Sequence, residues 1–401
     1  MHTETAITLT FLVLAYAVVS GLVHRWYVAP ALIFVVCGIA LGPSGAGWID
    51  VKNDDSESFT VLAQLALTVI LFNQASRLNL STVLRRGRLT LRLLAIGIPA
   101  SIALGTLAAV ALLPVLPLWE AVCLAVIVAP TEVALLSAVL DDTRIPERVR
   151  NALSAESGFY DGFALAALLA ALAVASEDRD PEPARWAWFV FRTEFVSLGV
   201  GLAIGALGAF VIVRSSNRQW MSATWAQLST VALALACFVT AERLHASGFV
   251  AAFAGGLAFT MVSARLGGQE ATTQVSDAIG ELLELLVFAM FGAFAVIDGF
   301  RHAGWRVVVF ALVALFVVRM AAVLLSMVRA NLPLSSTLFM GWFGPRGIGT
   351  MVLGLIVVDR GDIAHRGLIE ETVVIVVTLS LVLHSLTAPL SVRFAAKSAQ
   401  E

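Results

Sequence analysis

The feature that most constrains the fold is the distribution of charge along the chain. Charged side chains gather in short segments, and between them run apolar stretches long enough for a helix to cross a bilayer. Of the 401 residues, 59% are hydrophobic and only 13% are charged, with a mean hydropathy of +0.90. A membrane β-barrel would instead alternate in polarity over strands of about ten residues. The sequence therefore predicts an all-α polytopic membrane protein.

About thirteen transmembrane helices are expected in a single transmembrane domain covering residues 1–401, with no sizeable soluble domain. The first segment lacks the basic start and small-residue cleavage site of a signal peptide, so we interpret it as the first span. The spans are expected near residues 5–23, 28–43, 59–75, 90–113, 119–140, 150–175, 187–213, 221–242, 247–263, 277–297, 304–328, 334–357 and 370–391.

The loops indicate how the chain is oriented. If the N-terminus faces outward, the inside loops hold most of the Lys and Arg residues, including the Arg-rich segment 77–92. The outside loops are acidic at residues 50–57 and 177–182. Because cytoplasmic loops carry the excess of basic residues, we predict an outer N-terminus and a cytoplasmic C-terminus.

Several functional classes find no support in the sequence. The net charge of −2 gives no sign of nucleic-acid binding. Cys37, Cys123 and Cys237 lie in apolar runs without metal-ligand spacing, so we interpret them as core residues. We find no metalloprotease, nucleophile-elbow or phosphate-loop motif and no potassium-filter motif. We therefore expect no enzyme, no channel and no cofactor.

Two spans are interrupted near their middle. The fifth breaks at Ala129, Pro130 and Thr131, and the twelfth breaks at residues 344–347, Gly-Pro-Arg-Gly, which begin with Gly344. Both could be ordinary proline kinks, but each carries a charge, Glu132 or Arg346. Paired broken helices predict inverted repeats, about 1–175 and 221–392, whose breaks cross at the membrane midplane.

A second carboxylate pair lies in the sixth span. Glu156 and Asp161 stand in a long apolar helix, and charge at membrane depth costs roughly 2.5–3.5 kcal/mol on insertion scales. Ser157 and Asp161 are four residues apart and share a helix face. Oxygen ligands beside a broken helix suit Na⁺ or Li⁺. We hypothesise that Asp161 holds either a proton or a cation; the alternative is a buried Asp paired with an Arg.

Three further buried groups need an interpretation. A lone buried Arg requires a partner, and we expect Glu156 to pair with Arg346 and tie the sixth span to the twelfth. Arg319 is left to face Glu281 or Glu284, or to extend toward the interface. His384, in the last span, is either a packed, hydrogen-bonded histidine or a pH sensor.

Several segments together resemble the monovalent cation/proton antiporter superfamily, in its bacterial sodium/proton exchanger branch. The most specific is APTEVALLSAVLDDTRIPERVRNALSAESGFYDGFALA. VAPALIFVVCGIALGP, LALTVILFNQASRL, ELLELLVFAMFGA, GWFGPRGIGTMVLG and VVIVVTLSLVLHSLTAPL are similar to other family segments, so the resemblance covers nearly the whole chain.

The resemblance implies a sodium/proton antiporter fold, usually a homodimer in the bacterial inner membrane. Asp161 matches the family's essential carboxylate, Thr131 the crossing threonine, Ser157 a site serine, and Glu156 with Arg346 the pair that ties two helices. The chain departs from the family pattern at three positions. Glu132 stands where Asp is usual, Tyr160 where Asn or Asp precedes the essential acid, and Gln74 where an acid is common.

These observations predict a secondary antiporter that exchanges Na⁺ or Li⁺ for H⁺. Asp161 and Glu132 are the expected carboxylate ligands of the alkali cation, helped by Thr131, Ser157 and Gln74. The neighbouring residues Tyr160, Pro130 and Gly344 are expected to shape the site. A single acid in the Tyr160-Asp161 pair favours electroneutral 1:1 exchange. The alternatives are K⁺/H⁺ exchange and a non-transporting sensor or scaffold of the same fold.

Overall fold

A computed structural model describes most of the chain. The described residues are 3–26, 28–49, 56–77, 88–132, 135, 139, 142, 144–175, 183–267, 274–330, 332–359 and 363–398. Within these, the side chains of residues 56–58, 158, 161, 162, 173–175, 183–194, 359 and 392–398 are not described. The described residues form helices and turns and contain no strand, so the predicted all-α class is confirmed.

Nine of the helical stretches in the described residues are long and apolar enough to cross a membrane. Four shorter apolar helices accompany them, at Pro30–Leu41, Leu118–Val128, Phe163–Leu172 and Ile348–Val358. Most of the expected spans correspond to these stretches, within a few residues at each end. The multi-pass character is therefore confirmed, whereas the total of thirteen spans stays a prediction.

The chain divides into two compact units, which are described separately. The first unit comprises residues 1–61, 87–160 and 285–401, and the second comprises residues 62–86 and 161–284. These units follow a different division from the predicted repeats 1–175 and 221–392, and the repeats stay a prediction.

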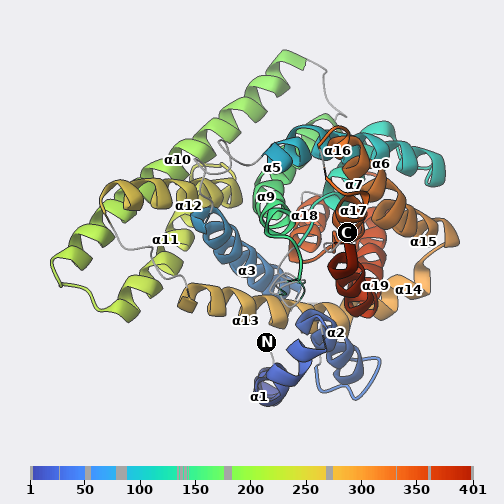
Figure 1. The fold of residues 1–401 in the computed structure, drawn as a ribbon, viewed down its shortest axis with the longest axis horizontal. Helices are drawn as coiled ribbons and strands as arrows, with labels where there is room; N and C mark the ends of the chain where they lie inside the picture. The colour runs from blue at the N-terminus through green and yellow to red at the C-terminus, as the bar shows by residue number, and fades with distance from the viewer. Residues whose placement is uncertain are drawn as a thin grey trace. The chain divides into compact units, whose positions relative to one another are not determined.

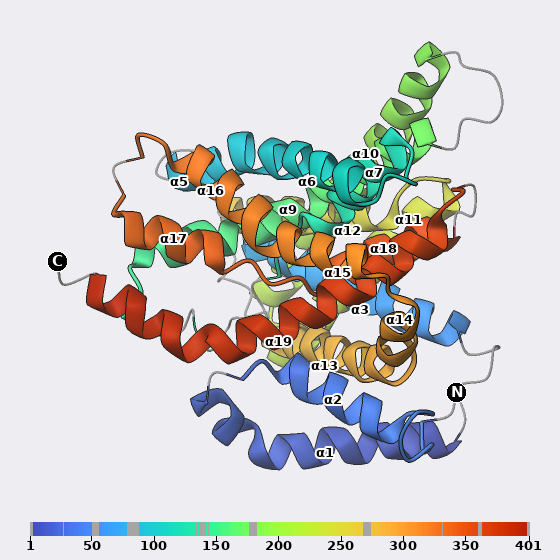
Figure 2. The same ribbon diagram turned by 90° about the vertical axis from the view of Figure 1, so that its right-hand side faces the viewer.

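The first unit contains both interrupted helices. In Figure 2, α1 runs beside α2, and α19 passes under α17. Three π-helical segments, Leu93–Gly97, Gly292–Val296 and Val313–Val318, interrupt its long helices. Its helices are α1 (Thr3–Arg25), α2 (Pro30–Leu41), α5 (Arg88–Arg92), α6 (Ile98–Leu112), α7 (Leu118–Val128), α9 (Glu147–Ala175) up to Tyr160, α14 (Ile297–His302), α15 (Trp305–Leu312), α16 (Arg319–Met327), α17 (Leu334–Trp342), α18 (Ile348–Asp359) and α19 (Arg366–Ser398).

Close backbone contact joins α2 to the π-helical segment Gly292–Val296. A Cβ atom added at Gly38 would lie 2.0 Å from the carbonyl oxygen of Ala289, and one at Gly292 would lie 2.2 Å from that of Val35. Only glycine permits an approach this close.

The second unit is built around α10, α11 and α12, which pack against one another (Figure 1). Its core includes Phe72, Cys237 and Phe259, and Gly201 and Gly205 on α10 lie against the backbone of Ala251 and Gly255 on α12. Its helices are α3 (Ser56–Arg77) from Leu62, α9 from Asp161, α10 (Pro183–Asn217), α11 (Ala223–Arg243), α12 (Gly248–Arg265) and α13 (Gln274–Phe291) up to Glu284.

Candidate functional site: the crossing of two broken helices

The first break follows α7. This helix ends at Val128, and residues 130–132 are not helical. Pro130 has no N–H to donate to the preceding turn and its ring clashes with a helical backbone, so the helix stops where the sequence predicted.

The second break lies between α17 and α18. The first of these helices ends at Trp342, the second begins at Ile348, and residues 343–347 between them are not helical. This break also lies at the predicted Gly-Pro-Arg-Gly segment. We refer to residues 129–132 and 343–347 together as the crossing.

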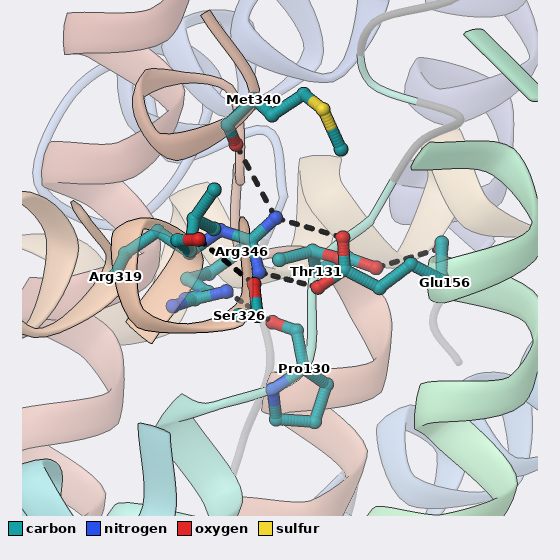
Figure 3. A network of polar contacts seen from close by, with 9 residues as sticks. Pro130, Thr131, Glu156, Arg319, Ser326, Met340 and Arg346 are labelled. Atoms are coloured by element: carbon teal, nitrogen blue, oxygen red, sulfur yellow. Dashed lines mark hydrogen bonds and ion pairs between the residues drawn. The ribbon is translucent and has the colours of Figure 1, made fainter. Parts of the chain in front are cut away.

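The two breaks bind each other through their backbones and one long side chain. The amide of Glu132 donates to the carbonyl of Pro345 at 2.8 Å. The Arg346 guanidinium donates in return to the carbonyl of Pro130, also at 2.8 Å (Figure 3). Each break thereby satisfies a backbone group that the other leaves without a helical partner.

Glycines make this approach possible. A Cβ atom at Gly347 would lie 2.6 Å from Cγ of Glu132. One at Gly344 would lie 2.8 Å from Nε of Arg319 and 3.1 Å from Cγ2 of Thr131. Gly344 therefore shapes the crossing, as the sequence predicted, by leaving room for an arginine side chain.

The buried ion pair of this unit joins Glu156 on α9 to Arg319 on α16. The guanidinium makes two hydrogen bonds to the carboxylate, one to Oε1 and one of 2.9 Å to Oε2. Both side chains are 2% exposed or less, and Arg319 also donates to the carbonyl of Met340 at 3.4 Å (Figure 3). A bidentate guanidinium–carboxylate pair is the arrangement in which a buried charge pair is best compensated.

The predicted pair of Glu156 with Arg346 is therefore wrong, as is the expectation that Arg319 faces Glu281 or Glu284 or extends toward the interface. Arg319 directly follows the π-helical segment Val313–Val318. A π-helical turn inserts a residue and rotates every side chain after it, which a count of helical spacing from the sequence does not include.

Arg346 has a different role from the predicted one. Its guanidinium binds Pro130, as described above, and its amide donates to Oγ of Ser380 at 2.7 Å. Within the described part of the chain, no carboxylate forms an ion pair with it. Arg346 is thus a buried cation that fixes the backbone of both breaks.

Two predicted site residues are brought together at the crossing. Ser157 on α9 donates its hydroxyl to the carbonyl of Thr131 at 2.7 Å, and both residues are buried. Glu132 is also buried, with 2% of its surface exposed. Ser157, Thr131 and Glu132 therefore place a hydroxyl, a carbonyl and a carboxylate in one unit.

The remaining predicted site residues have varied outcomes. Tyr160 is fully buried, and its hydroxyl has no hydrogen-bond partner among the residues described. Gln74 belongs to α3 in the second unit, where its Oε1 is buried. The backbone of Asp161 continues α9, but its side chain lies outside the described residues. A site that includes Asp161 and Gln74 stays a prediction.

Sequence reasoning missed two polar side chains that touch the breaks, Ser380 and Trp342. Ser380 stands four residues before His384 on α19, and this spacing could have indicated a shared face. The bonds of His384 and Trp342 involve backbone carbonyls, which no side-chain pattern reports.

Comparison with known proteins agrees with this architecture. A family model described as "Sodium/hydrogen exchanger, transmembrane" matches residues 9–397. The K(+)/H(+) antiporter NhaP of Alkalimonas amylolytica is 26% identical over 87% of this chain and 60% of its own length. A probable Na(+)/H(+) antiporter of Schizosaccharomyces pombe is 27% identical over 89% of this chain and 50% of its own length. The chain thus spans only about half of the length of these curated relatives.

The fold also matches a solved structure. The sodium proton antiporter MjNhaP1 from Methanocaldococcus jannaschii superimposes with a TM-score of 0.79, covering 95% of this chain and 98% of that one, at 18% identity. This likeness concerns the fold and confirms the predicted antiporter architecture. Because the family model covers nearly all of the sequence, this chain belongs to the sodium/hydrogen exchanger family of transmembrane proteins.

Proposed function

We propose that the chain is a secondary antiporter that exchanges a monovalent cation for a proton, with Asp161 as the shared binding group. The crossing is the observation that carries the proposal. It buries the Glu132 carboxylate beside the carbonyl of Thr131 and the hydroxyl of Ser157. Such oxygens suit an alkali cation, and the crossing belongs to a chain of the exchanger family.

The charges of the crossing support a one-for-one exchange. Glu156 and Arg319 neutralise each other as an ion pair, and Glu132 and Arg346 carry opposite charges. The four formal charges add to zero, so one further carboxylate, Asp161, suffices to hold one cation or one proton. Because equal charges cross in opposite directions, we expect the membrane potential to do no work on the cycle. A second proton per cation would couple about 2.3 kcal/mol per 100 mV.

The identity of the cation is the least constrained part of the proposal. We favour Na⁺ or Li⁺, with K⁺ as the alternative. Relatives exist for both, since one is named a K(+)/H(+) antiporter. A relative from Bacillus subtilis, 28% identical over 68% of this chain, is named a sodium, potassium, lithium and rubidium/H(+) antiporter.

We further propose a homodimer in the bacterial inner membrane, with the N-terminus outside and the C-terminus in the cytoplasm. The distribution of basic loops supports the orientation, and the family resemblance supports the dimer. The proposal includes no enzymatic activity and no cofactor.

The deciding experiment measures proton flux in proteoliposomes after addition of Na⁺, Li⁺, K⁺ or Rb⁺. We expect cation-driven proton movement in the wild type and none in Asp161→Asn. Asp298→Asn is the matched control, because this carboxylate is exposed on α14, and it should transport normally. Asp161→Asn that still exchanges would remove Asp161 from the mechanism. A wild type inactive with all four cations would favour the non-transporting sensor or scaffold.

The same assay tests the stoichiometry. An imposed membrane potential should leave the rate and direction of exchange unchanged if one cation is exchanged for one proton. A flux that follows the potential would refute the 1:1 assignment and point to a second titrating acid, for which Glu132 is the first candidate.

A further inference from the structure

His384 occupies an unusual position in the core of the first unit. It is 3% exposed and lies on α19. Its Nε2 lies 3.0 Å from the carbonyl oxygen of Trp342, the last residue of α17. Its Nδ1 lies 2.8 Å from the carbonyl oxygen of Ser380 and 3.2 Å from the hydroxyl of the same serine. The ring thus joins the end of the broken helix to α19.

Ser380 extends this contact into the crossing. Its hydroxyl oxygen accepts the amide N–H of Arg346 at 2.7 Å. A serine hydroxyl both accepts and donates, so its own proton remains available for Nδ1 of His384. The carbonyl that closes α17 and the amide inside the second break are therefore held by one His-Ser pair.

The two protonation states of the ring fit this arrangement differently. A neutral imidazole with its proton on Nε2 donates to Trp342 and accepts from the Ser380 hydroxyl at Nδ1. A doubly protonated ring donates from both nitrogens, so Nδ1 turns to the Ser380 carbonyl and the hydroxyl loses its acceptor. The neutral ring alone completes the chain from the Arg346 amide to the Trp342 carbonyl.

The surroundings of the ring also favour the neutral form. The rings of Phe316 and Phe343 lie beside it, with centroids 6.3 Å away in each case. The charged groups that act on it are two guanidinium groups, Arg346 and Arg319. Glu156 neutralises Arg319, and Glu132 lies across the crossing. The other neighbours, on α2, α19 and the break, are Ala29, Leu135, Pro345 and Leu381, none of which titrates.

We propose that His384, acting through Ser380, is a positioning residue for the second break, and that protonation of its ring releases the Arg346 backbone from the arrangement that transport requires. This inference rests on the proposed exchange activity. It adds a proton-sensitive contact separate from Asp161, and it predicts that part of the acid inhibition of exchange originates in α19.

The test compares the pH profile of exchange for four variants. His384→Gln keeps an N–H for Trp342 but does not titrate, and Ser380→Ala removes the connection to Arg346. We expect each to move the acidic limb of the profile to lower pH or to flatten it. The double variant should shift the limb no further than one single variant does, because both act on one chain of contacts.

Thr387→Val is the matched structural control. Thr387 accepts the indole N–H of Trp342 at 3.0 Å and so joins the same two helices without touching the crossing. This variant should lower thermal stability while leaving the pH profile unchanged. Additive shifts in the double variant, or a profile in His384→Gln that superimposes on the wild type, would overturn the proposal. A wild type without exchange would instead overturn the proposed function.

A second readout keeps the inference independent of transport. Hydrogen exchange of the 343–347 backbone should rise on acidification in the wild type and stay constant with pH in His384→Gln. Equal pH dependence in both proteins would refute the role of His384 even if transport profiles differ.

Discussion

Separating Glu156 from Arg319 should cost more stability than any other single side-chain change in the first unit. Both groups are almost fully buried and share two hydrogen bonds. Removing one partner leaves the other charged and buried, which typically costs about 3–5 kcal/mol. Because whole domains are stable by only about 5–15 kcal/mol, Arg319→Met should lower both folded yield and melting temperature strongly.

The partner can be identified with a double-mutant cycle in detergent, read out by thermal unfolding. If Arg319 is the partner, Glu156→Gln should recover much of the loss in Arg319→Met, because no unpaired charge remains. Glu156→Gln should not rescue Arg346→Met. Arg301→Met is the surface control: its pair with Asp298 is exposed, and such pairs contribute about 0–1 kcal/mol. Rescue of Arg346→Met, together with unchanged stability in Arg319→Met, would refute the assigned pair.

Two further predictions concern packing and a buried carboxylate outside the crossing. Gly38→Ala should destabilise the protein and slow exchange, because the new Cβ would press on the Ala289 carbonyl, whereas Gly21→Ala meets nothing within 4 Å and should be neutral. Glu120→Ala should cost about 1–3 kcal/mol in thermal unfolding, because this buried carboxylate accepts the amide that precedes His365 and contacts its ring. Glu120→Gln keeps an acceptor and should cost less; equal melting temperatures for the two would contradict this reading.

Much of the fold could be predicted because bilayer physics limits the choices. Apolar runs of helical length identified most of the membrane helices, and Pro130 and Pro345 located both breaks. These signals are local, since the residues that end a helix are neighbours in the sequence.

The pairing inside the site was harder to predict. Glu156 has two candidate arginines at similar depth, and only three-dimensional placement distinguishes Arg319 from Arg346. The π-helical segment that precedes Arg319 changes its direction without any clear sequence signature. The contacts of Ser380 and His384 escaped because they end on backbone atoms, whose positions depend on how the break is folded.

The distance along the chain between the partners at the crossing has a consequence for biosynthesis. Glu156 and Arg319 are 163 residues apart, and at a typical rate of about 5–20 residues per second the ribosome needs roughly ten to thirty seconds to cover that distance. During this interval the nascent first half has entered the translocon with its acid exposed and its carbonyls open. Some temporary protection, by protonation, by water or by an insertion chaperone, must bridge the wait until the last third of the polypeptide emerges.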